Sequence, residues 1–242
     1  MKLRSLVLTL TAGMALAGFG VPAAAAQFSD SQKAEIESIV YNYLLNNPDV
    51  MIEVGEKLKA RQEQIQEAQR DKAVQAIIAN PNIPQSGAEK PKHTIIEFFD
   101  YNCGYCKQAK PHTMKLLEKR NDVRYFYLEF PILTEVSYTA ARTGVAIYAM
   151  NPELYVKYNN DLMTRKSRLQ NEVEIQAAVE QLGLKWSEVQ ALAKSPAVND
   201  VLSQIRSLAD QMQVTGTPSF IIDGKPMHGA PRSVDTIESF FK

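Results

Sequence analysis

Two cysteines, Cys103 and Cys106, are the residues of this sequence best suited to covalent chemistry. They are the only cysteines among its 242 residues, and they lie three positions apart in Phe-Phe-Asp-Tyr-Asn-Cys-Gly-Tyr-Cys-Lys. A disulfide that closes so small a loop restrains little chain entropy. The pair is therefore better explained by reactivity than by stabilisation. A thiolate at one position can attack a disulfide, and the second thiol can then resolve the mixed disulfide.

A Cys-x-x-Cys pair can also be half of a zinc or Cu(I) site. The other soft ligands are His93, His112 and His228, which show no paired spacing and are better explained as surface or packing residues. We therefore predict no metal and no cofactor other than a redox-active disulfide between Cys103 and Cys106. A copper-binding or holdase chaperone module is the alternative from another functional class.

The segment around the cysteines predicts a strand followed by a helix. Apolar and β-branched residues over Thr94–Phe99 are typical of a strand, and the turn Asp100-Tyr101-Asn102 leads into a predicted helix over Cys103–Lys119. A second strand is predicted at Val123–Phe130, and strand–helix–strand order favours a parallel pair. Unpaired amides and the helix dipole favour a thiolate at the first cysteine, while the second lies one turn further in.

The remaining C-terminal region is predicted to be mainly helical from residue 134 to about residue 212. The candidate helices are Val136–Met150, Pro152–Met163, Glu172–Leu182, Trp186–Ala193 and Ala197–Met212. Two short strands, Ser219–Asp223 and Lys225–His228, then form a hairpin around an Asp-Gly turn. A last helix is expected after the capping residue Ser233.

The N-terminal residues 1–26 have the features of a cleavable secretory signal. A basic start is followed by the apolar run Leu6–Val21 and by four alanines, which is the usual order of such signals. No later segment is long and apolar enough to span a bilayer. Removal of Lys2 and Arg4 leaves 25 of the 27 basic side chains against 27 acidic ones. This balance gives no reason to expect a nucleic-acid partner.

Residues 27–84 predict an all-helical module. Ser29 and Gln32 fit a capping box, and Asn47-Pro48 is typical of a junction between two helices. The long second helix is too polar to be stable alone. It could lie on its own catalytic domain, act as a spacer or mediate self-association, and we favour self-association. Residues 85–92, which contain a proline and a glycine between polar residues, are predicted to be a linker.

Two motifs resemble the periplasmic Dsb proteins of the thioredoxin superfamily. They are Glu97-Phe-Phe-Asp-Tyr-Asn-Cys-Gly-Tyr-Cys106 and Gly216-Thr217-Pro218-Ser219-Phe220. The resemblance implies an α/β fold in which residues 93–242 form a thioredoxin-like catalytic domain with a helical insertion at about 134–212, preceded by the all-helical module. It also implies that Pro218, after Thr217, is cis and lies against the active-site sulfurs.

The same resemblance assigns Glu97 a role as a buried acid that relays a proton to or from Cys106. Its side chain is expected on the face of the strand opposite to Ile96 and Phe98. The alternative is a glutamate that points outward from the edge of the strand and takes no part in the chemistry.

The residues next to the reactive groups distinguish two branches of the family. Gly104-Tyr105 and Thr217 are similar to the DsbC-type isomerases, whereas DsbA-type oxidases carry Pro-His and Val at these places. A motif without histidine predicts a Cys103 pKa in the upper part of the range of roughly 3.5 to 7 found among relatives. The resulting disulfide would be less oxidising than that of DsbA.

The extra N-terminal helices resemble those of ScsC-like and Com-type proteins, which implies a homodimer or homotrimer formed through residues 27–84. Taken together, these features predict a periplasmic protein disulfide isomerase acting on exported client proteins. Its dithiol would be kept reduced by a membrane reductase of DsbD type. The alternative is a disulfide-forming oxidase reoxidised by a DsbB-type partner, or a protein that performs both reactions.

Overall fold

The computed structural model describes residues 28–241, and the predicted secretory signal, residues 1–26, lies outside this range. The chain divides into two compact units, Met1–Leu58 and Lys59–Lys242. Within the described residues, no helix combines the length and the apolar character needed to cross a membrane.

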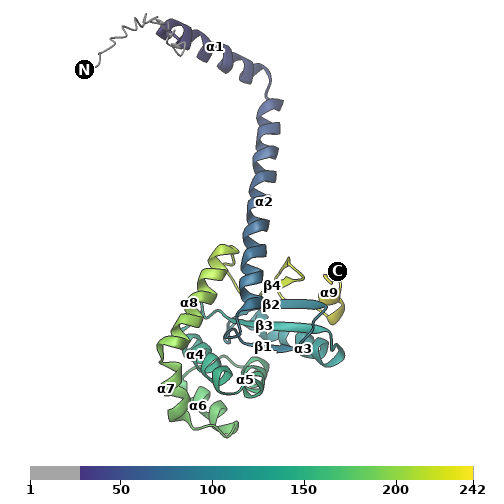
Figure 1. Ribbon diagram of the computed structural model, residues 1–242, viewed down its shortest axis with the longest axis vertical. Coiled ribbons are helices and arrows are strands. Elements are labelled where there is room, and N and C mark those ends of the chain that lie inside the picture. The colour runs from purple at the N-terminus through teal and green to yellow at the C-terminus, as the bar shows by residue number, and fades with distance from the viewer. Residues whose placement is uncertain (1–27, 242) are drawn as a thin grey trace, which may run out of the picture. The chain divides into compact units, whose positions relative to one another are not determined.

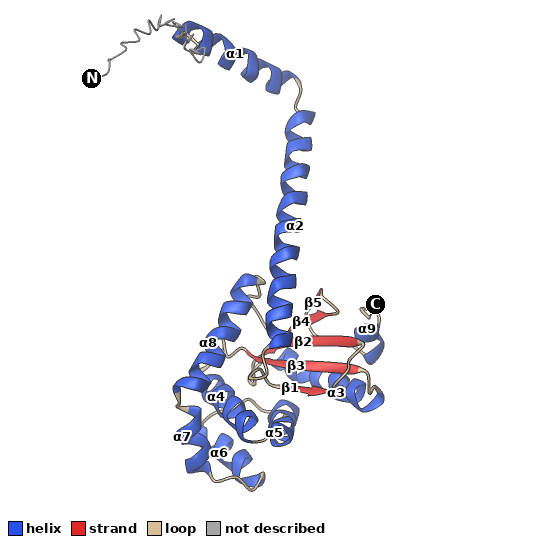
Figure 2. Cartoon of the chain, in the orientation of Figure 1, coloured by secondary structure: helices blue, strands red, loops and turns tan. Residues whose placement is uncertain are grey.

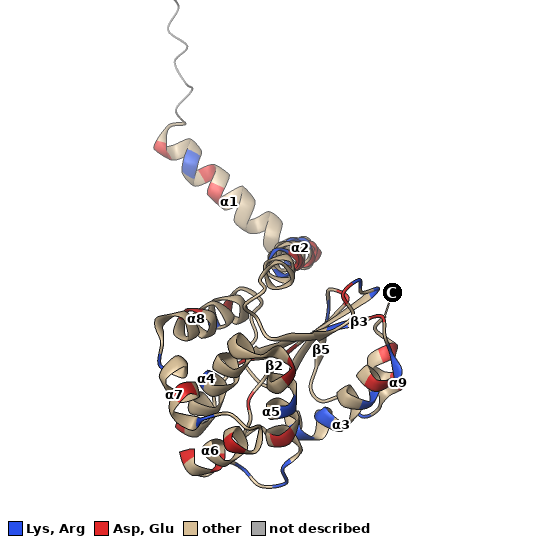
Figure 3. Ribbon diagram, turned by 60° about the horizontal axis from the view of Figure 1, so that its bottom comes forward, with Lys and Arg blue, Asp and Glu red and all other residues tan. Residues whose placement is uncertain are grey.

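The first unit holds helix α1 (Asp30–Asn46) and the beginning of helix α2 (Asp49–Ala79). The predicted capping box is confirmed: the Ser29 hydroxyl accepts from the Gln32 amide, and the Gln32 side chain accepts from the Ser29 amide. No residue of α1 is buried. Its charged residues lie in its first half, and the second half contains only uncharged residues, as the ribbon colours in Figure 3 show.

The second unit is built on one five-stranded sheet with the strand order β1-β3-β2-β4-β5 (Figure 2). The predicted parallel pair is confirmed, because β2 and β3 run parallel and all other neighbours are antiparallel. The strands are β1 (Gln85–Gly87), β2 (His93–Phe99), β3 (Val123–Glu129), β4 (Ser219–Ile222) and β5 (Lys225–His228).

Helix α3 (Gly104–Lys119) connects the parallel strands, and α9 (Val234–Glu238) packs against it. A cluster of five helices is inserted between β3 and β4 and lies beside the sheet in Figure 1. These helices are α4 (Glu135–Met150), α5 (Pro152–Thr164), α6 (Glu172–Gln181), α7 (Trp186–Ala193) and α8 (Pro196–Gln211). The expected α/β fold with a helical insertion and preceding helices is therefore present.

The boundary between the helical module and the catalytic domain differs from the prediction in two ways. Residues Gln85–Gly87, predicted as part of a linker, form the edge strand β1 and pair with Arg124–Phe126. The last turns of α2 bury Ala73, Val74 and Ile77 in the core of the second unit. The linker prediction is wrong for β1 because a polar three-residue strand has no periodic pattern, and its partner strand alone determines its conformation.

We expect Ile77→Ala to lower the free energy of unfolding of the second unit by about 2 to 5 kcal/mol, as for other fully buried large-to-small changes. Ile77 is 0% exposed, whereas the next residue, Ile78, is 40% exposed. Ile78→Ala is the matched control and should change stability by less than about 0.5 kcal/mol. Urea unfolding of the full chain measures both, and equal effects would show that α2 does not belong to this core.

Candidate active site

Cys103 is the N-cap residue of α3. Its sulfur accepts a hydrogen bond from the Cys106 amide at 3.4 Å, and its thiol donates to the Thr217 carbonyl at 3.2 Å. The peptide bond between Thr217 and Pro218 is cis. The predicted geometry is thus confirmed: one sulfur caps a helix, the second cysteine lies one turn further along, and the cis-proline loop lies against the first sulfur.

The two cysteines lie in different environments. The pKa of the Cys103 thiol is lowered to about 6. The largest cause is hydrogen bonding from the Cys106 side chain, and Thr217 and backbone amides add to it. Burial acts in the opposite direction. Burial raises the pKa of the Cys106 thiol far above its ordinary value. Near neutral pH, Cys103 is therefore the thiolate available to attack, and Cys106 is a protected thiol.

Ultraviolet titration of the reduced protein should show Cys103 ionising with a midpoint near pH 6. Because the Cys106 side chain is the largest cause of this shift, Cys106→Ala should move the midpoint up towards the ordinary cysteine value of about 8.5. Cys103→Ser, which removes the titrating group, is the control. A midpoint near about 3.5, as in the most acidic relatives, would contradict the assignment.

Glu97 lies on β2 and is 3% exposed, so its side chain points into the protein and not outward from the strand. The Tyr125 hydroxyl donates to its carboxylate. Burial raises the pKa of Glu97 to about 7, and the Tyr125 hydrogen bond and the positive charge of Lys110 oppose this rise. The Glu97 charge in turn contributes to the raised pKa of Cys106, after burial and the hydrogen bond with Cys103.

Lys110 is a site residue that the sequence analysis missed. It is buried, and its ammonium donates to the Asn159 amide oxygen of α5 at 2.5 Å. Burial lowers its pKa, while the charges of Glu97 and Glu129 raise it. The sequence feature that could have indicated Lys110 is its spacing, because a residue four positions after Cys106 lies on the same face of the helix. Because a lysine is seldom buried, the sequence alone does not mark this position as part of the site.

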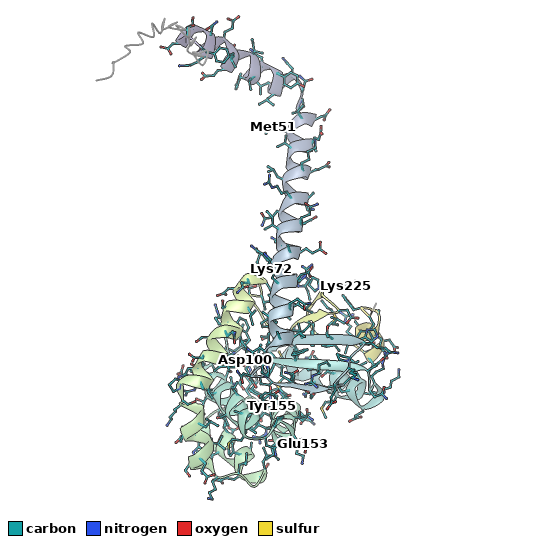
Figure 4. All side chains as sticks on the ribbon, in the orientation of Figure 1. Met51, Lys72, Asp100, Glu153, Tyr155 and Lys225 are labelled. Carbon is teal, nitrogen blue, oxygen red and sulfur yellow. The ribbon has the colours of Figure 1, made fainter. Side chains whose placement is uncertain are left out.

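Asp100, labelled in Figure 4, directly follows β2, and its carboxylate accepts four hydrogen bonds from three segments of the chain. One of its carboxylate oxygens accepts from the Asn102 amide and the Ser137 hydroxyl, both at 2.7 Å. The other accepts from the amides of Ile132 and Leu133 at 2.9 and 3.0 Å. One buried carboxylate therefore fixes the turn before Cys103 relative to the loop after β3 and to the start of α4.

An open groove of about 610 Å³ runs past the reactive sulfur. Tyr105 and Leu133 are its exposed large apolar side chains, at 66% and 48%. The lining residues are Cys103, Gly104, Tyr105, Gln108, Ile132, Leu133, Arg168, Thr215, Gly216 and Thr217. A mainly apolar groove that contains an ionisable thiol and a backbone loop can accommodate an extended polypeptide beside its disulfide.

His93 is held by contacts within the second unit. His93 pairs with Asp223 at 2.7 Å and stacks on the Phe241 ring at 4.1 Å, as expected for a packing residue. Among residues 28–241, no cluster of three or more histidine, cysteine, aspartate or glutamate side chains is arranged to hold a metal ion.

A thiol at a helix N-terminus, a buried partner thiol and a facing cis-proline are the arrangement expected of a thioredoxin-type dithiol site. The family model of the DSBA-like thioredoxin domain matches residues 94–242, and the chain belongs to this family. The model of the copper resistance protein ScsC N-terminal domain matches residues 32–64.

Solved structures agree with this assignment. A thioredoxin-like oxidoreductase from Silicibacter pomeroyi is 30% identical, with a TM-score of 0.63 over 68% of this chain and 92% of that one. A linker-deletion mutant of Proteus mirabilis ScsC is 22% identical, with a TM-score of 0.69 over 90% and 96% of the two chains, and supports the fold.

The curated relatives are larger proteins. The Na(+)/H(+) antiporter NhaA 3 of Salinispora tropica is 24% identical over 153 residues, which are 63% of this chain and 23% of that protein. The chain thus spans about a quarter of the length of the curated relatives it matches.

Proposed function

We propose that this protein is a periplasmic disulfide isomerase that acts on exported proteins through the dithiol of Cys103 and Cys106. The observation that carries the proposal is the contrast between the two thiols: an ionisable Cys103 at an open groove and a buried Cys106 behind it. The periplasmic location rests on the predicted signal in residues 1–26. Detection of a mature N-terminus at Gln27 by mass spectrometry tests that part.

In the proposed reaction, the Cys103 thiolate attacks one sulfur of a client disulfide, and the other client sulfur leaves as a thiolate. If a second client thiolate then attacks the mixed disulfide, Cys103 is released and the client disulfide is rearranged without net redox change. If Cys106 attacks instead, the client is released as a dithiol and the enzyme forms the Cys103–Cys106 disulfide. Glu97 accepts the Cys106 proton in this second route.

The isomerase assignment is supported by the Cys103 pKa of about 6. A thiolate of this basicity is a poorer leaving group than one with a pKa near about 3.5, so the enzyme disulfide is a weaker oxidant. An isomerase of this kind needs a reductase of DsbD type to keep it reduced. The alternative, an oxidase, needs a DsbB-type partner, and a largely oxidised Cys103–Cys106 pair in the intact cell would favour it.

The homo-oligomer is supported by the apolar surface of the first unit. Its exposed large apolar residues are Phe28, Ile36, Ile39, Val40, Tyr41, Tyr43, Leu45, Met51, Ile52, Val54 and Leu58. Such a density of exposed apolar side chains marks an interaction site, and α1 has no buried residue that could stabilise it alone. A second and third copy of the same helices would cover this surface and bring several dithiols to one client.

We expect replacement of Ile39 and Tyr43 together with lysine to shift the full mature chain from an oligomer to a monomer, because both side chains are exposed on the charge-free half of α1. Light scattering after size exclusion measures the mass. Ser38→Lys, on the same helix turn, is the control for added charge and should leave the oligomer intact. A monomeric wild-type chain would contradict the proposed assembly.

Recovery of active ribonuclease from its scrambled form tests the activity. The reduced protein should restore ribonuclease activity, Cys103→Ser should not, and the Ile39/Tyr43 double variant should be slower while still reducing a small disulfide. The opposite result would assign the oxidase function instead of the isomerase function. In that case the reduced wild type fails to rearrange scrambled ribonuclease, and its disulfide form rapidly oxidises reduced ribonuclease.

A further inference from the structure

A basic loop at the edge of the groove is held by the residues that flank the dithiol. This loop, residues 165–170, connects α5 with α6. Lys107, which follows Cys106, donates its ammonium to the carbonyls of Leu162, Arg165 and Ser167 at 3.0, 3.0 and 2.9 Å. The Lys107 charge is therefore used to hold backbone carbonyls in position.

Asn102, which precedes Cys103, holds the other end of the loop. Its buried amide accepts from the Leu169 amide at 2.8 Å and donates to the Leu169 carbonyl at 3.1 Å. It also donates to the Thr134 hydroxyl at 3.0 Å, and this bond connects the segment after β3 to Asn102. The loop is thus fixed at both ends relative to the reactive sulfur, as a specificity element requires.

The fixed loop presents unpaired positive charge to the groove. Arg165 pairs with Asp161 at 2.6 Å. Lys166 and Arg168 are exposed, and no carboxylate within residues 28–241 forms an ion pair with either. Figure 3 shows basic residues, coloured blue on the ribbon, in the connection next to α6. Of the two free cations, only Arg168 lines the groove that contains Cys103.

We propose that Arg168 makes the groove selective for client segments that carry a carboxylate within a few residues of the reactive cysteine. This inference rests on the proposed exchange activity and adds the chemistry of its preferred substrate. Ile132, Leu133 and Tyr105 offer apolar contacts to the client side chains beside its cysteine. The guanidinium of Arg168 then pairs with an aspartate or glutamate of the same segment, since Arg binds carboxylates through two parallel hydrogen bonds.

The ion pair between Arg168 and the client carboxylate would form at the exposed rim of the groove, so its effect on the exchange rate is moderate and depends on salt. We expect a rate advantage of about fivefold for an acidic over a neutral segment at low ionic strength. The advantage should decrease as salt is added towards about 1 M, where the screening length falls to about 3 Å. A basic segment should be slower than the neutral one, because its charge would lie beside Arg168.

The experiment uses the reduced full chain and synthetic peptides that each contain one cysteine in a mixed disulfide with 2-mercaptoethanol. The peptides differ only in an Asp, Asn or Lys placed one to three positions on either side of the cysteine. Stopped-flow measurement gives the second-order rate constant for each. At the best position, the ratio of Asp to Asn rates should be about five for the wild type, about one for Arg168→Gln and below one for Arg168→Glu.

Lys166→Gln is the matched control, because it removes an exposed cation from the same loop but not from the groove lining. It should keep the wild-type ratio. An equal loss of selectivity in Lys166→Gln and Arg168→Gln, or a wild-type ratio of one at every position, would overturn the assignment to Arg168. Failure of the wild type to reduce hydroxyethyl disulfide, a neutral small substrate, would instead contradict the proposed exchange activity.

Discussion

Cys103→Ser is expected to reduce thiol–disulfide exchange to the uncatalysed background, whereas Cys106→Ala is expected to allow the first attack and then stop at the mixed disulfide. The reason is the difference between the two thiols. Cys103 ionises near pH 6 and lies at the groove, while Cys106 is buried and remains protonated until a mixed disulfide forms beside it. A serine hydroxyl cannot supply an equivalent nucleophile at neutral pH.

The measurement is non-reducing electrophoresis and mass spectrometry of each variant after incubation with oxidised client protein. Cys106→Ala should accumulate an adduct of one enzyme and one client, and the adduct should disappear on reduction. Cys103→Ser should give none, although it retains Cys106. If Cys103→Ser formed adducts as readily as Cys106→Ala, the assignment of nucleophile and resolving thiol would be reversed.

The parts of this protein that could be predicted from sequence are those whose signals are local. Ser29 and Gln32 satisfy each other's backbone and side-chain groups across one helical turn, so the capping pair is visible in four consecutive residues. The place of Cys103 is also a local signal, because the residue just before a predicted helix is its expected N-cap. The predicted bounds of β2, β3 and α3 differ from the observed ones by a single residue at most at each end.

The parts that could not be predicted depend on contacts between distant residues. Asn102 holds Leu169 across 67 positions, and Lys107 holds the carbonyl of Ser167 across 60. Nothing near either residue in the sequence indicates its partner. The burial of Lys110 is likewise decided by Asn159, 49 positions away, which supplies the hydrogen bond that makes a buried ammonium tolerable.

These long-range contacts connect the helical insertion to the chemistry. Asn159 of α5 binds Lys110, and Lys110 is the cation that acts on both buried glutamates of neighbouring strands. Glu129 accepts from the hydroxyls of Tyr101 and Tyr155 at 2.8 and 3.0 Å. The insertion therefore supplies one of these two hydrogen bonds to Glu129 and the hydrogen bond that Lys110 donates, and its packing influences the proton equilibrium of the active site.

Glu97→Gln is expected to slow the attack of Cys106 on the mixed disulfide by about 100-fold, the size typical of a lost general base. The Cys106 pKa is too high for free ionisation, so its proton must be taken by a nearby group, and Glu97 with a pKa of about 7 is suited to this near neutral pH. Gln keeps the shape and an acceptor for Tyr125. Quenched-flow measurement of mixed-disulfide resolution tests this, and Glu129→Gln is the control for loss of a buried carboxylate.

The pH dependence separates a proton relay from a structural role. In the wild type, the resolution rate should rise with pH through about 7, as Glu97 loses its proton. Lys110→Met removes the positive charge that lowers the Glu97 pKa, so the rise should move to higher pH, whereas Lys115→Met, an exposed lysine of the same helix, should leave it unchanged. A resolution rate in Glu97→Gln that keeps the wild-type pH profile would contradict the relay.

As the pH rises through about 7, the free energy of unfolding should decrease while the rate of mixed-disulfide resolution increases. The Glu97 pKa is raised from 4.5 to about 7, so the folded protein binds more protons than the unfolded chain between these values. Its stabilising contribution is complete below pH 4.5 and is lost as the pH rises through about 7. The glutamine of Glu97→Gln does not ionise, so the variant avoids this loss of stability. Urea unfolding at pH 8 should show the variant to be more stable than the wild type. A slower and more stable variant is the expected result when a buried acid is retained for chemistry.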